Sequence, residues 1–405
     1  MEGLDVFIYD SVRTPRGRGD TKGALHSISP MDLLKPLYCA ILERNTLQSD
    51  FIEDVILGCV TQVGDQGTNI ARISALYGGL SHSISGVTLN RFCASGLDAC
   101  QYASMKIASG SESLVLAGGV ESSSRVPMFS DNGAWFKDPR VAKASRFIHM
   151  GVAADLVATQ NSITRDEIDT YALRSQQRAA KATAAGDFFK SVVPIISDTE
   201  EIVLEQDELI RPQTTLEKLG TLPPAFSEIG AAGADRLALK YHPALAAINH
   251  IHHLGTSPAL ADGASLLLIG NEAAGKQLEL KPKARVLACS NVATEPVEML
   301  TGNIPGTLKA LKSSGLEIGD IDSFEVNESF AAIPIQYQRR FELPDEKLNP
   351  CGGAIAMGHA LGATGAMLLE ILMETLAQKT RRYGLVSICG GAGVASTMIV
   401  ENLRR

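Results

Sequence analysis

Short apolar runs bounded by glycine alternate with stretches of helical periodicity along most of the chain. Apolar runs of about four to eight residues between turn signals predict buried strands, and strands alternating with helices are typical of α/β proteins. The expected strands are residues 6–9, 55–57, 113–117, 264–269, 284–288, 323–326 and 385–388. The hydrophobic pattern therefore predicts an α/β fold.

Between about 120 and 250 the pattern changes to polar and helical. Thr164-Arg-Asp-Glu167 has the form of a capping box and predicts the start of a long amphipathic helix. We expect an inserted, largely helical loop domain at 121–244. The N-terminal half would then be 1–120 plus 245–275, and the C-terminal half 276–405.

The two halves show a weak internal repeat. In the first, Cys93-Ala-Ser-Gly-Leu leads into a helical segment, a strand and Gly118-Gly119; in the second, His359-Ala-Leu-Gly leads into a helical segment, a strand and Gly390-Gly391. Gly96 to Gly118 spans 22 residues and Gly365 to Gly390 spans 25. This similarity predicts two copies of one α/β unit packed against each other.

Composition narrows the class of protein. Apolar residues make up 45% and charged residues 20%, as in soluble globular enzymes. A net charge of -8 supplies no field for binding nucleic acid, and no apolar run reaches the ~18 residues of a membrane span. Seven scattered cysteines suit a reducing compartment, and no leader precedes the first strand. We expect a cytoplasmic protein without nucleic-acid or membrane partners.

The segment NRFCASGLDACQYA at 90–103 reads as a polar turn opening into a helix. Cys93 would lie at the helix N-terminus, where free N–H groups and the helix dipole favour the nucleophilic thiolate. The alternative is a small buried cysteine that fills a helix–strand contact. This segment alone leaves both open.

The segment NPCGGAIAMGHALGATGAMLL at 349–369 carries five glycines. A dinucleotide-binding loop is the obvious alternative, but G-H-A-L-G-A-T-G from Gly358 is not the G-x-G-x-x-G spacing. The glycines more plausibly let backbone approach a ligand or another helix, which would leave His359 exposed on a tight loop.

Two further segments contain candidate polar groups. SICGGAGVAS at 387–396 ends a strand with Cys389 and two glycines, so it can present a thiol and a bare backbone N–H to one space. EVNESFAA at 325–332 places Asn327 between a strand and a helix, where asparagine is most often an N-cap.

NRFCASGLDA, HMG at 149–151, VNESFAA, GGAIAMGHALGATGA and the cysteine of ICGG together resemble the thiolase family, in the family's order and spacing over nearly the whole chain. The resemblance implies a thiolase-like fold: two similar α/β units with mixed five-stranded sheets, layered α/β/α/β/α, and an inserted loop domain. It implies an acyltransferase that cleaves 3-ketoacyl-CoA to acetyl-CoA and a shortened acyl-CoA, or condenses two acetyl-CoA.

The same resemblance assigns roles. Cys93 would take the acyl group, His359 would activate it with an imidazole of near-neutral pKa, and Cys389 would exchange a proton with the α-carbon of acetyl-CoA. Asn327 would hold a water that, with His359, stabilises the enolate. The N–H groups of Cys93 and Gly391 would form a second oxyanion hole.

For coenzyme A, which would be a cosubstrate and not a permanently bound cofactor, the resemblance implies contacts from Met150, Ser257 and Phe330. Simple core packing is the alternative for Met150 and Phe330. Pro258 stands where many relatives have the CoA-contacting serine. The chain also departs from common family residues at Cys351, Ala360, Ala392 and Ala395.

Rival functions remain at this stage. One rival is a ketoacyl synthase, which would share the nucleophilic cysteine but pair it with two histidines. Another is a protein that binds coenzyme A but has little catalytic activity left. The chain also resembles thiolase subunits that join a hydratase/dehydrogenase partner in fatty-acid β-oxidation. A homodimer or homotetramer is expected from the family.

A histidine cluster could suggest a metal. His250, His252 and His253, with His242 as a fourth histidine, are expected to have no acidic or cysteine companion nearby, and the chemistry of thiolases uses no metal. We therefore expect no metal site.

Overall fold

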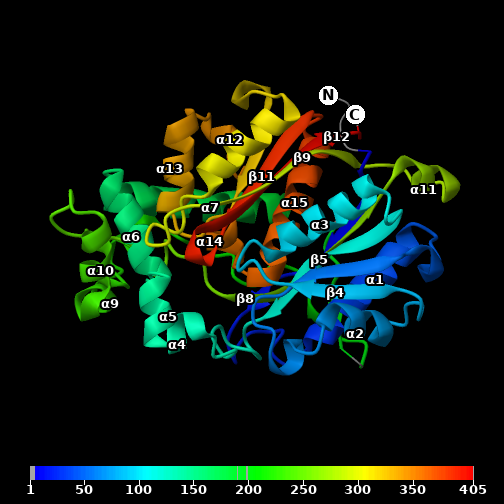
Figure 1. The fold of residues 1–405 in the computed structure, drawn as a ribbon, viewed down its shortest axis with the longest axis horizontal. Helices are drawn as coiled ribbons and strands as arrows, with labels where there is room; N and C mark the ends of the chain where they lie inside the picture. Colours follow the sequence, from blue (N-terminus) through cyan, green and yellow to red (C-terminus); the bar gives the residue numbers. More distant parts are fainter. Residues whose placement is uncertain (1–4, 189, 198, 405) are drawn as a thin grey trace.

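The computed structural model describes residues 5–188, 190–197 and 199–404. Its main feature is a ten-stranded sheet made of two halves that meet edge to edge (Figure 1). The strand order is β10-β11-β12-β9-β1-β8-β5-β3-β4, and β2 (Gly17–Arg18) pairs with β8. Within the described residues, strand pairing between the two halves of the sheet is limited to β1 and β9, where Phe7 pairs with Arg285 and Ile8 with Ala284.

The N-terminal half repeats strand and helix in the predicted way. Its elements are β1 (Phe7–Arg13), α1 (Pro30–Arg44), β3 (Asp54–Gly58), α2 (Ile70–Tyr77), β4 (Ser85–Leu89), α3 (Ser95–Ser109), β5 (Leu114–Ser122), β8 (Ala261–Gly270) and α11 (Glu272–Gln277). Strand β3 runs parallel to β4 and β5, whereas β8 is antiparallel to β5 and β1.

The C-terminal half follows the same plan. Its elements are β9 (Ala284–Ala293), α12 (Asn303–Ser314), β10 (Ser323–Val326), α13 (Ala332–Phe341), α14 (Ala354–Met357), α15 (Leu361–Gln378), β11 (Tyr383–Cys389) and β12 (Val394–Asn402). β10 is parallel to β11, and β12 is antiparallel to β11 and β9. At the position of β4 there is only a parallel bridge between Phe324 and Leu348, so this half has four strands where five were expected. The shared order confirms two similar α/β units.

Helices α3 and α15 form the central layer, between the strands of the two halves (Figure 1). They approach closely because glycines face each other's backbone: a Cβ on Gly96 would lie 2.6 Å from the Gly362 oxygen, and one on Gly365 would lie 2.5 Å from the Leu97 nitrogen. Helices α1 and α2 cover the outer face of one half, and α12 and α13 that of the other. The predicted α/β/α/β/α layering is therefore present.

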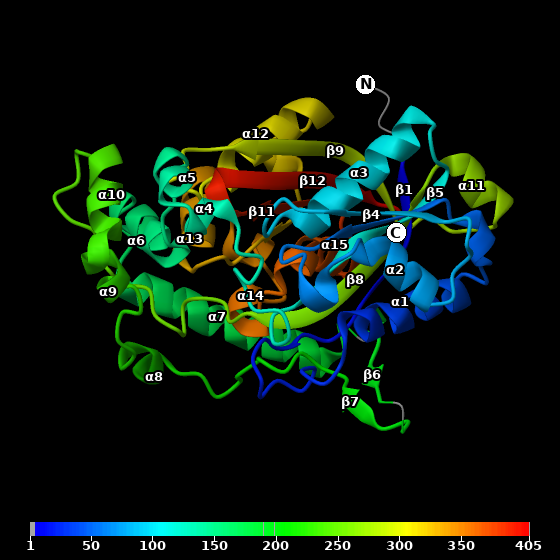
Figure 2. The ribbon, with the colours of Figure 1, turned by 60° about the horizontal axis from the view of Figure 1, so that its bottom comes forward.

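The segment between β5 and β8 runs along one side of the molecule (green in Figure 2). It contains α4 (Ala134–Lys137), α5 (Pro139–Ala144), α6 (Met150–Gln160), α7 (Arg165–Ala185), β6 (Ile195–Ile196), β7 (Ile202–Leu204), α8 (Leu216–Gly220), α9 (Ser227–Ile229), a π-helical turn (Gly230–Ala234) and α10 (Asp235–Tyr241). The predicted capping box opens α7, with Thr164 and Glu167 bonded reciprocally. The division at 120, 244 and 275 remains a proposal, and β5 extends two residues past the first boundary.

Short 3-10 turns complete the chain at Ser49–Phe51, Gly64–Gln66, Ile318–Asp320, Asp345–Lys347 and Gly391–Gly393. Among the described helices, none combines the length and apolar character needed to cross a membrane.

Candidate active site

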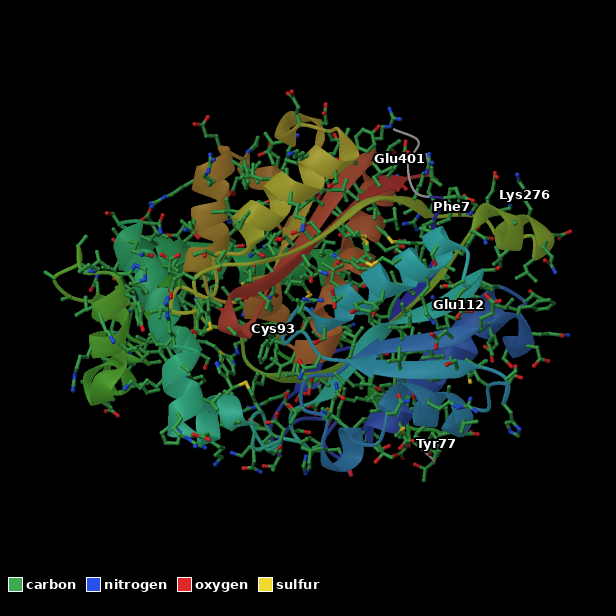
Figure 3. The ribbon with its side chains drawn as sticks, in the orientation of Figure 1. Phe7, Tyr77, Cys93, Glu112, Lys276 and Glu401 are labelled. Carbon is green, nitrogen blue, oxygen red and sulfur yellow. The ribbon has the colours of Figure 1, made fainter. Side chains whose placement is uncertain are left out.

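A tight turn between β4 and α3 positions Cys93, near the middle of the molecule where the halves meet (Figure 3). Asn90 Oδ1 accepts from the Phe92 N–H at 2.8 Å, and Ser95 Oγ accepts from the Arg91 N–H at 2.8 Å. Phe92 adopts a left-handed φ of 49°. Because α3 begins at Ser95, Cys93 lies just before the helix N-terminus, as predicted.

The electrostatic environment of Cys93 differs from the expectation. Burial raises the pKa of its thiol to about 12, and negative charge on Cys389 acts in the same direction. The backbone N–H groups of Cys93 and Gly391 act in the opposite direction and lower this pKa. The helix terminus therefore does not keep the Cys93 thiol deprotonated. The N–H groups of Cys93 and Gly391 are nevertheless near the sulfur that would carry an acyl group.

His359 is buried, not exposed as predicted, with 5% of its surface accessible. Its backbone makes two hydrogen bonds: the N–H donates to Ala259 O at 2.8 Å, and the carbonyl oxygen accepts from the Ala261 N–H at 3.1 Å. Gly358 before it has a φ of 91°, and a Cβ there would lie 2.6 Å from Leu209. The predicted tight glycine loop exists, but it folds inward.

The imidazole of His359 has one bound and one open nitrogen. Nδ1 lies 2.8 Å from Thr364 Oγ1, while Nε2 is buried without a hydrogen-bond partner. Burial, and then the charge of Arg16, lower the pKa of His359 to about 3, so the expected near-neutral pKa is wrong for this structure. The ring is neutral at physiological pH. With Nδ1 protonated toward Thr364, Nε2 is available to accept a proton.

Cys389 ends β11 and is fully buried. Its Sγ lies 3.2 Å from Ser329 Oγ, and Ser329 in turn accepts from Asn327 Nδ2 at 3.0 Å. Burial raises the pKa of Cys389 to about 11, against the lowering effect of the Ser329 hydrogen bond. Asn327 therefore connects to the site through Ser329, a residue that the sequence analysis did not single out.

One cavity of about 270 Å³ brings the candidate residues together. Cys93, His359, Cys389 and Gly391 line it, and so does Ser329; Asn327 is not among the lining residues. The residues predicted to contact coenzyme A also line this cavity, namely Met150, Ser257 and Phe330. The structure thus gathers seven of the eight predicted site residues around one space.

Aromatic side chains form much of the cavity wall, which sequence reasoning missed. The Phe92 and Trp135 rings are 5.0 Å apart, and Trp135 meets Phe147 edge to face at 4.9 Å. Phe136 and Phe226 also line the space. A Cβ on Gly391 would lie 3.0 Å from Trp135, so the indole packs directly against Gly391. The signal available in the sequence was the only tryptophan, in a polar helical segment.

The histidines at 250–253 do have acidic companions, contrary to the sequence analysis. Asp155 lies 2.8 Å from His250 Nδ1 and 2.7 Å from His252 Nδ1, and Asp169 lies 2.6 Å from His253 Nε2. The aspartates come from α6 and α7, which are distant in sequence. Across the described residues, no group of three or more His, Cys, Asp or Glu is arranged to hold a metal ion.

Comparison with known proteins agrees with this geometry. The family description "Thiolase, N-terminal domain" matches residues 6–238, and "Thiolase, C-terminal domain" matches residues 280–402. The chain is 37% identical to a 3-oxoadipyl-CoA/3-oxo-5,6-dehydrosuberyl-CoA thiolase of Escherichia coli (strain K12), covering 98% of this chain and 100% of that protein. It is also 37% identical to a 3-ketoacyl-CoA thiolase of Salmonella typhimurium, over 98% and 99% of the two chains.

Among solved structures, the acetyl-CoA acetyltransferase of Bacillus anthracis is similar, with a TM-score of 0.86 and 30% identity. The similarity covers 99% of each chain. It therefore includes both α/β halves and the segment between them.

Proposed function

The chain belongs to the thiolase family and is an acyl-CoA acyltransferase, and we propose that it works through an acyl group carried on Cys93. The observation that supports this role is the cavity that Cys93 shares with His359, Cys389 and Gly391, in which the backbone N–H groups of Cys93 and Gly391 act to lower the pKa of the Cys93 thiol. Such donors stabilise the oxyanion of a tetrahedral adduct on the cysteine.

In the cleavage direction, His359 Nε2 takes the proton of Cys93, and the sulfur attacks the 3-keto carbon. The C2–C3 bond breaks, and the thiol of Cys389 protonates C2, releasing acetyl-CoA. The Cys389 thiolate then recovers a proton from His359, and the neutral imidazole takes the proton of the incoming coenzyme A thiol as that sulfur attacks the acyl-cysteine. Cys93 leaves as thiolate and regains its proton from His359, so both acid/base groups return to their starting forms.

Formation of the acyl-enzyme tests this assignment. After brief exposure to acetyl-CoA, peptide mapping by mass spectrometry should find one acetyl group on Cys93, and Cys93→Ala should retain coenzyme A binding but lose turnover. Acetylation on Cys389 or Cys351 in place of Cys93 would overturn the assignment. This experiment does not test the water-holding role proposed for Asn327, whose Nδ2 donates to Ser329 in this structure.

For the acyl chain we propose an uncharged, apolar tail. The cavity is lined mainly by aromatic and aliphatic side chains, and among its described lining residues Asp131 is the one carboxylate and none is lysine or arginine. A carboxylate tail, such as that in the name of the E. coli relative, would lose hydration without gaining a cation. CoA-dependent cleavage of acetoacetyl-CoA, 3-ketooctanoyl-CoA and 3-oxoadipyl-CoA should show the last as the poorest substrate. A kcat/KM for 3-oxoadipyl-CoA equal to the others would contradict the proposal.

We propose that the protein is a homo-oligomer, at least a dimer. Strand β4 is an edge strand of the sheet, and its Val87 is 43% exposed; helix α2 packs on this strand, and its Ile73 is 41% exposed. Tyr102 and Met105 of α3 are also exposed. Light scattering should give at least twice the chain mass, and a hydratase/dehydrogenase subunit in the natural complex would show by co-purification.

A further inference from the structure

Ser329 stands between two groups of the proposed mechanism. It lies in the segment between β10 and α13, is 7% exposed and lines the cavity. Its Oγ accepts from Asn327 Nδ2 at 3.0 Å and lies 3.2 Å from Cys389 Sγ. The three side chains form a short hydrogen-bonded chain that ends on the acid/base sulfur.

The chemistry of the donors gives this chain a direction. An amide nitrogen can only donate, so the Asn327 contact uses a lone pair of Ser329 and leaves the hydroxyl hydrogen free for another acceptor. The sulfur of Cys389 is within reach of that hydrogen. When Cys389 is a thiolate, a bond donated by Ser329 is charge-assisted and stronger than one between neutral groups.

The backbone around Ser329 is fixed from two sides. Asn327 donates its N–H to Ser387 O at 2.9 Å, on the same strand that ends at Cys389. Glu328 is buried and accepts from Tyr171 at 2.9 Å and from Ser175 at 2.7 Å. The serine is therefore held between β11 and α7, and its distance to the sulfur is set by the fold.

We propose that Ser329 is a positioning residue for Cys389, whose hydroxyl donates a hydrogen bond to the thiolate and holds the sulfur toward the α-carbon. This inference rests on the acid/base role proposed for Cys389. Ser329 transfers no proton: the proton moves between Cys389 and the α-carbon, and the serine hydrogen stays on its oxygen.

The groups facing Cys389 from other elements agree with this role. Cys93 lines the same cavity and carries no positive charge, and Asn303, from α12, presents a neutral amide toward the sulfur that acts to lower the pKa of Cys389. His359 is neutral in the same cavity. Until His359 takes the proton of Cys93, no cation is present among these groups, so hydrogen bonds are the means of stabilising a Cys389 thiolate in the resting enzyme.

The test separates the two half-reactions in the full-length enzyme. Exchange of the α-hydrogens of acetyl-CoA for deuterium requires Cys389, whereas acetyl transfer from acetyl-CoA to Cys93 does not. In Ser329→Ala, exchange should fall about 10-fold or more, and its pH profile should move about one unit to higher pH, as expected for loss of a hydrogen bond to a charged group. Acetyl transfer should stay unchanged, and Ser329→Thr should recover most of the exchange.

Ser290→Ala is the matched control, because Ser290 is a buried serine that donates to Gly306 O at 2.8 Å and does not line the cavity. It should leave both half-reactions and the pH profile unchanged. Equal loss of both half-reactions in Ser329→Ala, or an unmoved pH profile, would overturn the inference. If Cys389→Ala itself keeps exchange, the proposed function of Cys389 fails instead, so the two failures are distinguishable.

Discussion

Replacing Thr364 by valine tests whether the tautomer of His359 matters for acylation. Thr364 is fully buried in α15, and its Oγ1 lies 2.8 Å from His359 Nδ1. Valine keeps the shape and removes the hydroxyl. A buried Nδ1–H would then have no acceptor, so the tautomer with an unprotonated Nε2, the one that can take a proton from Cys93, loses its stabilisation.

The expected magnitude follows from one hydrogen bond. The net contribution of such a bond is about 1 kcal/mol, and a stranded buried donor costs about 1 to 3 kcal/mol. Since about 1.36 kcal/mol corresponds to tenfold in rate, acetylation of Cys93 should slow by about 10-fold. The bond needs only a hydroxyl, so Thr364→Ser should acetylate at close to the rate of the unmodified enzyme.

The assay is single-turnover acetylation by acetyl-CoA, quenched and measured by mass spectrometry. Thr375→Val is the matched control, because Thr375 is a buried threonine on the same helix, with Cys351 Sγ at 3.5 Å from its Oγ1. An unchanged rate in Thr364→Val, or an equal fall in Thr375→Val, would refute the reasoning.

Three further predictions concern other parts of the structure. Cys389→Ser should lower full thiolysis by at least about 100-fold while acetyl exchange between CoA molecules persists, since a positioned acid/base contributes about that much; equal loss in both assays would contradict this. Burial acts to lower the pKa of His250, but hydrogen bonds to Asp155 and Asp235 outweigh it and raise this pKa above its ordinary value. The contribution of His250 to stability is therefore fully present below the unfolded pKa of about 6.5 and is lost as the pH rises through the folded pKa. Urea unfolding of His250→Gln should therefore show a larger deficit at pH 6 than at pH 9. Thr164→Ala removes the N-cap of α7 and should lower the free energy of unfolding by about 1 kcal/mol with activity intact, as urea titration and thiolysis assays can show.

Most strands could be predicted because they are short apolar runs, several of them buried on both faces. β5 and β8 are buried at every position, which matches their sequences. β4 was missed because Ser85-Gly-Val-Thr-Leu mixes small and polar residues, and every residue of this edge strand is exposed or half-buried. The central packing of α3 on α15 gave no periodic signal, since it depends on backbone approach at glycines.

The site was predictable in identity but not in environment. Glycines and turn residues surround Cys93, His359 and Cys389. These features are local, so they can be recognised in the sequence alone. The burial of His359, the aromatic wall and the acids beside His250 and His253 arise from segments far apart in the chain. Ser329 looked like one more residue of a helix start, and its contact with Cys389 exists only once β10 lies next to β11.

The repeated architecture also determines which half of the chain supplies each catalytic residue. Cys93 stands before α3 in one half, and His359 stands before α15 at the equivalent point of the other, so two matching helix starts carry different chemistry. After a duplication, such positions can specialise separately, one as nucleophile and one as proton acceptor. Neither unit alone contains a working set, so a split chain should regain turnover only by complementation of its two fragments.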